Sequence, residues 1–171
     1  YINFNAGATR IKFSINLSGE SFEDDEFYVK LSNLLRKHKP KGLSQRLMFE
    51  ITESSHIKDI RRVSRYIQDL KAEGFFTALD DFEADDESMK FLRMIDVNAV
   101  KVDGRITTKI LTSQPDLALM KHIIKTCNDM GKTIIAKSVE DKKQLELLRE
   151  MGIALGQGFY FGELSSKPDY T

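Results

Sequence analysis

Charged and amide side chains stand at the C-terminal ends of short apolar runs at six places along the chain. These residues are Asn16, Glu50 with Glu53, Asp80 with Asp81, Lys101 with Asp103, Lys137 with Glu140, and Gln157. Carboxylate and amide oxygens are the ligands that Mg²⁺, Mn²⁺ and Ca²⁺ prefer in proteins. The adjacent carboxylates Asp80 and Asp81 also repel each other unless a cation or a donor compensates them. Any one of these residues is typical of a helix cap as well, but six such sets together favour a common polar site.

The apolar runs that end at these residues are short and β-like, and segments of helical period separate the runs. The runs are Ile11–Leu17, Leu47–Ile51, Phe75–Leu79, Ala99–Val102, Thr133–Ala136 and Ala154–Leu155. Apolar residues recur every three to four positions in Phe27–Leu35, Ile57–Leu70, Leu117–Met130 and Leu145–Met151. Gly74, Gly131 and Gly152 stand where such segments end and are predicted helix C-caps.

This alternation predicts an α/β fold of about six β/α units with a parallel sheet and right-handed crossovers. A doubly wound sheet and a (β/α) barrel both fit the pattern. A complete eight-unit barrel takes about 250 residues, which is longer than this chain. No glycine-rich phosphate loop follows the first run, which argues against a nucleotide-binding doubly wound sheet. In either fold the strands end at one rim, and that rim carries the active site or ligand crevice.

Composition narrows the class of protein further. The 171 residues favour one domain, and 26 Lys and Arg balance 26 Asp and Glu, which argues against binding DNA through bulk charge. No apolar run approaches the length of a membrane helix, and residues 1–10 lack the pattern of a signal peptide. The single cysteine, Cys127, excludes an internal disulfide and a cysteine-based metal site. These features fit a cytoplasmic protein.

Five motifs in order along the chain resemble those of EAL domains, which are bacterial cyclic di-GMP phosphodiesterases built on a modified (β/α)₈ barrel. The motifs are Ser14-Ile15-Asn16-Leu17-Ser18, Glu50-Ile51-Thr52-Glu53-Ser54, Ala78-Leu79-Asp80-Asp81-Phe82, Lys101-Val102-Asp103 and Gln157-Gly158-Phe159. Each motif is weak alone, but five in the family order indicate homology over most of the chain.

The resemblance implies a two-metal mechanism in which Mg²⁺ or Mn²⁺ ions activate water and clamp the phosphate, giving linear pGpG. It implies metal ligands at Asn16, Glu50, Asp80 and Asp81, the first three for one ion and Asp81 for the other. Lys101 matches the lysine near the attacking water and phosphate.

The resemblance also assigns supporting roles at the rim. Gln157 matches a residue that helps to hold the water and metal network. Glu140 matches a carboxylate behind the metal ligands. Glu53 matches a glutamate that anchors the loop after the Asp-Asp strand.

This chain departs from the family pattern by a missing segment and by an exchanged residue. The chain begins near the third strand of the family, and the Glu-Ala-Leu segment, with a metal-binding glutamate and a ligand-binding arginine, does not occur in it. We therefore expect one EAL-like domain over residues 1–171 that is truncated at its N-terminus and completed by further sequence or a partner segment.

Lys137 stands where the family has a catalytic glutamate. Unit charges about 4 Å apart interact by roughly 4 kcal/mol at an effective dielectric near 20, so this exchange could prevent a dication from binding. Lys137 would then pair with Asp80, with Asp81 or with a substrate phosphate, or else point to solvent.

A third departure is the loop after Asp80-Asp81, where the family has a glycine-rich segment and this chain has Phe82-Glu83-Ala84-Asp85-Asp86-Glu87-Ser88. Its carboxylates would repel an anionic dinucleotide, but acidic residues also favour the start of a helix over Met89–Ile95. The helix start is the preferred interpretation.

Three hypotheses for function follow. The first is a catalytically impaired domain that senses cyclic di-GMP or serves as an interaction module. The second is an active phosphodiesterase, using Mg²⁺ or Mn²⁺, whose missing glutamate lies upstream of Tyr1. The third is a structural or regulatory domain that binds no nucleotide and no metal. The resemblance further implies GGDEF, PAS or receiver domains as neighbours in the full-length protein, and a homodimer formed near the altered loop.

Overall fold

The computed structural model describes residues 2–3, 13–37, 46–52, 57 and 59–162. Within them a seven-stranded sheet runs in the order β1-β7-β6-β5-β4-β3-β2. The strands are β1 (Ile2–Asn3), β2 (Phe13–Leu17), β3 (Leu47–Thr52), β4 (Phe76–Phe82), β5 (Ala99–Val102), β6 (Thr133–Ala136) and β7 (Leu155–Gly156). Neighbours from β2 to β7 pair in parallel, as predicted, whereas β1 pairs antiparallel with β7. β1 was not predicted, because Ile2–Asn3 contains one apolar residue and shows no readable pattern.

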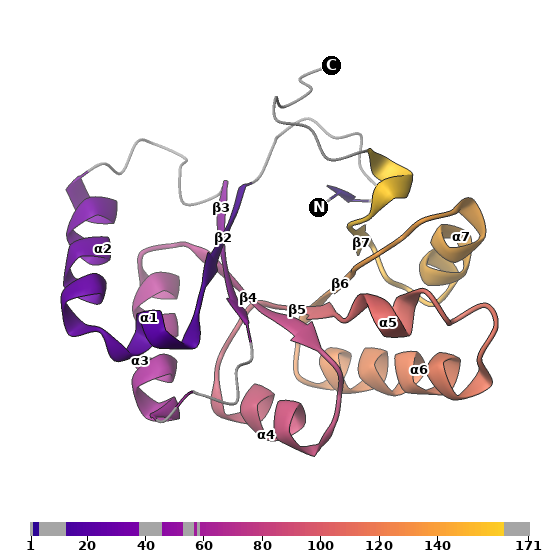
Figure 1. The fold of residues 1–171 in the computed structure, drawn as a ribbon, viewed down its shortest axis with the longest axis horizontal. Helices are drawn as coiled ribbons and strands as arrows, with labels where there is room; N and C mark the ends of the chain where they lie inside the picture. Colours follow the sequence, from indigo (N-terminus) through magenta and orange to yellow (C-terminus); the bar gives the residue numbers. More distant parts are fainter. Residues whose placement is uncertain (1, 4–12, 38–45, 53–56, 58, 163–171) are drawn as a thin grey trace.

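Helices follow the parallel strands along the chain and cover one side of the sheet. They are α1 (Gly19–Glu23), α2 (Asp25–Lys37), α3 (Ile60–Ala72), α4 (Asp86–Met94), α5 (Gly104–Thr107), α6 (Gln114–Asp129), α7 (Lys142–Glu150) and the 3₁₀ helix η1 (Phe159–Phe161). The sheet curves into a trough that opens upward in Figure 1, with α2, α3, α4, α6 and α7 on its outer side. The architecture is α/β with six β/α-type strands, as in a partial (β/α) barrel.

Local signals explain where the helices begin and end. Ser113 accepts a hydrogen bond from the amide of Asp116 and so caps α6, and Asp141 with Gln144 forms a capping box at α7. Gly74, Gly131 and Gly152 all have positive φ, which confirms the predicted C-caps. None of the helices in the described ranges is long and apolar enough to span a bilayer.

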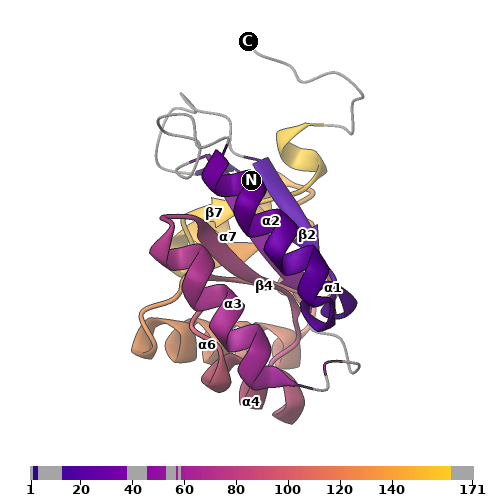
Figure 2. The same cartoon turned by 90° about the vertical axis from the view of Figure 1, so that its left-hand side faces the viewer.

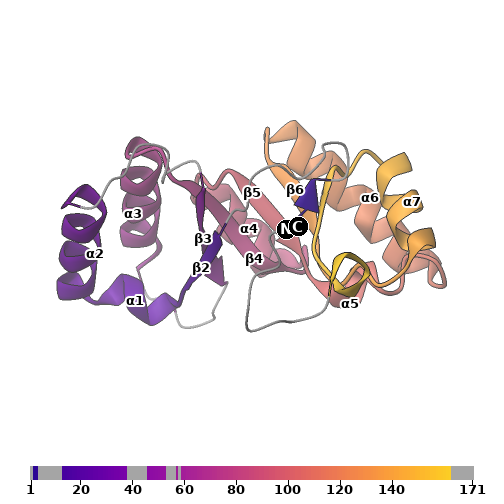
Figure 3. The same cartoon turned by 90° about the horizontal axis from the view of Figure 1, so that it is seen from above.

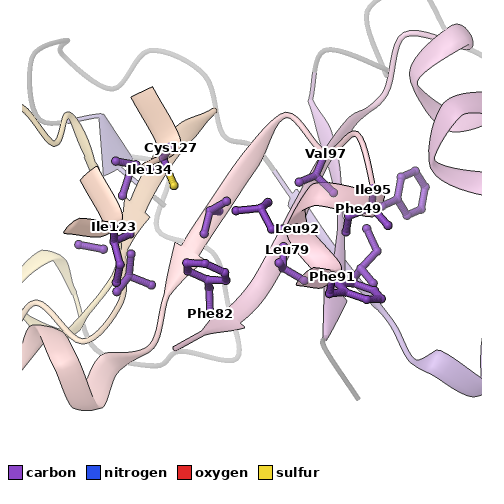
Figure 4. Packing of buried hydrophobic residues seen from close by; sticks show 14 of the residues in the cluster. Phe49, Leu79, Phe82, Phe91, Leu92, Ile95, Val97, Ile123, Cys127 and Ile134 are labelled. Atoms are coloured by element: carbon purple, nitrogen blue, oxygen red, sulfur yellow. The ribbon is translucent and has the colours of Figure 1, made fainter. Parts of the chain in front are cut away.

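The main core lies between the outer face of the sheet and the helices. Figure 4 shows it running from Phe49 and Leu79 on β3 and β4, past Phe82, to Ile123 and Cys127 on α6. At the β2–β3 side, α2 and α3 lie side by side (Figure 2). There the rings of Tyr28 and Tyr66 stack with centroids 3.7 Å apart. The core holds the strands in register and so fixes the inner face of the trough.

Candidate functional site

The inner face of the trough has an apolar layer with a charged layer next to it. Side chains alternate between the two faces of a strand, so each charged residue stands two positions after a buried apolar one. The pairs are Met48 and Glu50 on β3, Ala78 and Asp80 on β4, Ala99 and Lys101 on β5, and Ile135 on β6 and Lys137, the first residue after that strand. The C-terminal ends of four neighbouring strands thus bring together residues that are up to 87 positions apart, from Glu50 to Lys137.

Lys101 is the buried cation of this charged layer. Its Nζ lies 2.6 Å from Glu50 Oε2 and 3.5 Å from Asp80 Oδ2, and its side chain is 3% exposed. A buried ion pair is retained only when its charges are well compensated. Lys101 therefore stabilises two of the carboxylates that the sequence predicted to meet.

Lys137 is the second cation of the layer and is more accessible. Its Nζ donates to Asp80 Oδ1 at 2.9 Å and also to Asp81 Oδ1, and its side chain is 21% exposed. Burial lowers the pKa of the Lys137 ammonium, but the hydrogen bonds to Asp81 and Asp80 outweigh burial, so the pKa is raised above its ordinary value. The alternative in which Lys137 points to solvent is wrong, and its predicted pairing with Asp80 and Asp81 is confirmed.

A bulge allows both aspartates to reach the same ammonium. Adjacent residues of a regular strand point to opposite faces, yet Asp80 and Asp81 both bind Lys137. The register between β4 and β5 shifts between Leu79 and Phe82, and Asp81 has φ of 54°. A β-bulge re-aims a side chain in this way. The amide of Asp81 also donates to Asp80 Oδ1 at 2.9 Å, which fixes the turn.

A hollow of about 420 Å³ lies beside the charged layer, on the β4–β5 side of the rim. It is lined by Thr52, Asp81, Glu83, Asp85, Glu87, Asp103 and Arg105. Asp103 accepts from Arg105 Nε at 2.9 Å, and this contact lowers the pKa of the Asp103 carboxyl. Arg105 also binds Glu83 and so ties the loop after β4 to α5. No motif pointed to Arg105, because its contact with Glu83 forms only in the folded chain.

The acidic loop after β4 begins a helix, as predicted. Asp85 is the N-cap of α4 and accepts from the amide of Ser88 at 2.8 Å, which lowers the pKa of its carboxyl. Asp86 and Glu87 occupy the first turn, where the helix dipole favours negative charge. Ala84, just before the cap, has φ of 61° although it is not glycine.

The other predicted site residues are spread along the rim. Asn16 is exposed on β2, in register with Glu50 of β3. Gln157 is exposed after β7, and its backbone amide donates to Ala136 O at 2.8 Å. Glu140 is exposed, and its amide donates to Gln144 Oε1 at 2.7 Å. Glu53 lies outside the described residues.

The described residues do not fit a divalent cation as they are arranged. Glu50, Asp80 and Asp81 each already bind a lysine ammonium. Across the described ranges, no three His, Cys, Asp or Glu side chains gather as a metal-binding group. The metal-ligand roles of Asn16, Glu50, Asp80 and Asp81 stay predictions.

A family model and the curated relatives that match this chain point to the same family. The family model described as EAL domain matches residues 3–164. Cyclic di-GMP phosphodiesterase PdeB of Shewanella oneidensis is 33% identical over 152 residues, which cover 87% of this chain and 17% of that protein. The chain spans about a fifth of the length of the curated relatives it matches.

Solved structures agree with this match. The EAL domain protein from Listeria monocytogenes superposes with a TM-score of 0.79 at 26% identity, covering 89% of this chain and 60% of that one. The manganese and cyclic di-GMP complex of Klebsiella pneumoniae BlrP1 superposes with a TM-score of 0.73 at 26% identity, covering 86% of this chain and 38% of that one.

Proposed function

Because this chain belongs to the EAL domain family, we propose that it is a domain of bacterial cyclic di-GMP signalling that binds the dinucleotide without hydrolysing it. Relatives named cyclic di-GMP phosphodiesterases and a neighbour solved with cyclic di-GMP support the choice of ligand. The contact of Lys137 with both Asp80 and Asp81 carries the proposal that hydrolysis is lost.

The physical reason is competition for the same oxygens. A dication at Asp80 and Asp81 would have to displace the Lys137 ammonium or bind next to it. At about 4 Å and an effective dielectric near 20, each pair of unit charges contributes roughly 4 kcal/mol, so a dication is repelled by roughly twice that. Lys137 thus supplies the positive charge that the carboxylates need and opposes a metal in the same place.

An active phosphodiesterase is the second candidate. Glu50, Asp80 and Lys101 do meet on the inner face, which is the arrangement predicted for such an enzyme. In that case the metal ligands would be Asn16, Glu50, Asp80 and Asp81 with Mg²⁺ or Mn²⁺. Lys101, Gln157 and Glu140 would have the supporting roles that the family resemblance implies, and Glu53 would anchor the loop.

Titration of purified protein with cyclic di-GMP in the presence of Ca²⁺ tests binding, and replacing Ca²⁺ by Mn²⁺ tests hydrolysis through release of pGpG. We expect binding and no pGpG. Release of pGpG that Glu50→Gln abolishes would overturn the loss of hydrolysis, and absence of any binding would overturn the proposal as a whole.

The role of Lys137 has its own test, which is Mn²⁺ binding without nucleotide. We expect Lys137→Glu to bind Mn²⁺ in calorimetry, because it replaces the resident ammonium by a carboxylate. Lys142→Glu on α7 is the matched control, since it makes the same charge change at an exposed position away from the inner face. Equal Mn²⁺ binding by wild type and both variants would contradict the role of Lys137.

The assembly of the full-length protein is part of the same proposal. We propose a single EAL-like domain over residues 1–171 joined to other signalling domains such as GGDEF, PAS or receiver domains, with a homodimer near the loop that contains Glu83 and Asp85. Light scattering of wild type and of a Glu83→Lys, Asp85→Lys double variant tests the dimer, and an unchanged mass would contradict its location.

A further inference from the structure

A second hollow lies on the outer side of the trough, between α3 and the end of α4. It has a volume of about 270 Å³ and is lined by Ile60, Arg61, Ser64, Arg65, Gln68 and Met94. Figure 3 shows α3, together with α2, at the end of the molecule opposite α6 and α7. Because α3 and α4 cover the outer face, the sheet separates this hollow from the charged layer on the inner face.

Four side chains of α3 give the hollow a stripe of hydrogen-bond donors. They stand at positions i, i+3, i+4 and i+7 of the helix, which share one face, and they are Arg61, Ser64, Arg65 and Gln68. Two like charges four positions apart destabilise a helix slightly. The stability of α3 therefore gives no reason for the two arginines of this stripe.

The other charges near the start and on the neighbouring faces of α3 are already compensated. Arg62 binds Asp25 on α2. Asp59 is the N-cap and accepts from two backbone amides of the first turn, and Asp69 accepts from the hydroxyl of Tyr28. Within the part of the chain that the structure describes, the hollow has no acidic lining residue, and neither arginine of the stripe is paired with a carboxylate. Two guanidinium groups are thus left to bind an anion.

We propose that this hollow binds a phosphate monoester, with Arg61 and Arg65 on the phosphate oxygens. A guanidinium donates two parallel N–H bonds that match the spacing of phosphate oxygens. Ser64 and Gln68 add uncharged donors beside them. Met94 is 44% exposed and supplies an apolar wall for the carbon atoms next to the phosphate.

The size of the hollow favours a phosphorylated side chain of a partner protein as the source of the phosphate. Pockets that enclose a small-molecule ligand have volumes of about 300–1,000 Å³, and this hollow, at about 270 Å³, is smaller. Arginine clusters are the usual receptors for phosphorylated protein segments. Anionic membranes attract broad clusters of Lys and Arg, whereas α4 beside the hollow begins with Asp86 and Glu87.

Fluorescence anisotropy with a labelled peptide that carries one phosphoserine between two leucines tests the site, and the same peptide without phosphate is the reference. We expect wild type to bind the phosphorylated form at least about tenfold more tightly, because hydrogen bonds to charged groups each contribute about 1.5–3 kcal/mol. The double variant Arg61→Gln, Arg65→Gln should lose this preference. The double variant Arg61→Lys, Arg65→Lys should lose part of it, since lysine keeps the charge without the planar fork.

The double variant Lys90→Gln, Arg93→Gln is the matched control. It removes two positive charges from exposed positions of α4 that do not line the hollow, and it should keep the preference for phosphate. Equal losses in this control and in the Arg61, Arg65 variant would show attraction by bulk charge and overturn the site.

The remaining outcomes distinguish the sources of the phosphate. If the two peptides bind wild type equally, the phosphate site is wrong. If inorganic phosphate binds as tightly as the phosphorylated peptide, or if wild type binds vesicles containing phosphatidic acid and not the peptide, a protein partner is overturned. The proposed binding of cyclic di-GMP is measured separately and stands or falls independently of these results.

Discussion

At the scale of single residues, Lys101 compensates two carboxylates that are almost fully buried. We expect Lys101→Met to lower the free energy of unfolding by about 3–5 kcal/mol, because it leaves Glu50 and Asp80 buried with one cation fewer. Urea unfolding measures this loss. Lys125→Met is the matched control, since Lys125 pairs with Asp129 on the exposed side of α6, and surface pairs contribute little. A loss below about 1 kcal/mol for Lys101→Met would show that the pair is not buried in solution.

Cys127 gives a second prediction at this scale. The thiol is fully buried in the main core, and burial raises its pKa to about 11. A thiol reacts as the thiolate, so we expect folded protein to resist a disulfide reagent at pH 8 and to react fully once urea unfolds it. Rapid labelling of the folded protein would contradict the burial of α6 against the sheet.

At the scale of elements, α5 and the loop after β6 fit together at Gly104 and Ser138. A Cβ on Gly104 would lie 2.2 Å from Ser138 Oγ and 2.8 Å from Ser138 Cβ. Ser138 has φ of 56°, a conformation that glycine adopts more easily. We expect Gly104→Ala to destabilise the fold by about 1–3 kcal/mol. We expect Ser138→Gly to be neutral or slightly stabilising, because it relieves the left-handed backbone.

The double variant decides whether these two effects share one cause. Gly104→Ala combined with Ser138→Gly should regain most of the lost stability, because the colliding side chain is gone, and urea unfolding of all four proteins forms a double-mutant cycle. Additive losses would mean that α5 and the loop do not meet at this point.

The strands also explain why part of the charged layer could be predicted from the sequence. Glu50, Asp80 and Lys101 stand at the ends of apolar runs that are readable from the sequence, so their meeting on one rim followed from the parallel alternation of strands and helices. The bulge at Asp81 was not predictable, because it depends on the register between β4 and β5. The Arg105 contact with Glu83 was likewise hidden, since it joins α5 to the loop after β4.

At the scale of the whole molecule, the parallel order from β2 to β7 was predictable because short apolar runs alternate with long helices of readable period. The short α1, α5 and η1 were not predictable because they are too short to show a helical period, and β1 was not because it contains one apolar residue. The strand predicted over Phe75–Leu79 runs over Phe76–Phe82 in the structure. The prediction ended early because Asp80 and Asp81 interrupt the apolar pattern, whereas the strand continues past the bulge to Phe82.

The underside of the trough carries an ion-pair network that makes stability depend on pH. Asp96, in the loop between α4 and β5, accepts from Lys132 Nζ at 2.7 Å and also binds Lys71 at the end of α3. Lys132 first, and then Lys71, lower the pKa of Asp96 to about 2. A carboxyl with a lowered pKa in the folded state adds stability above its unfolded pKa of about 3.9, and this stability is lost as pH falls toward the folded value.

We therefore expect Asp96→Asn to have a lower free energy of unfolding than wild type, by a constant amount between pH 5 and 8. This gap in the free energy of unfolding should close as pH falls from about 4 toward 2. Urea unfolding across this range measures the gap. Asp129→Asn, which removes an exposed partner of Lys125 on α6, should give a smaller gap at every pH. A gap for Asp96→Asn that persists undiminished to the lowest pH would mean that Asp96 acts through packing of the loop, and that the three elements it joins are not held by its charge.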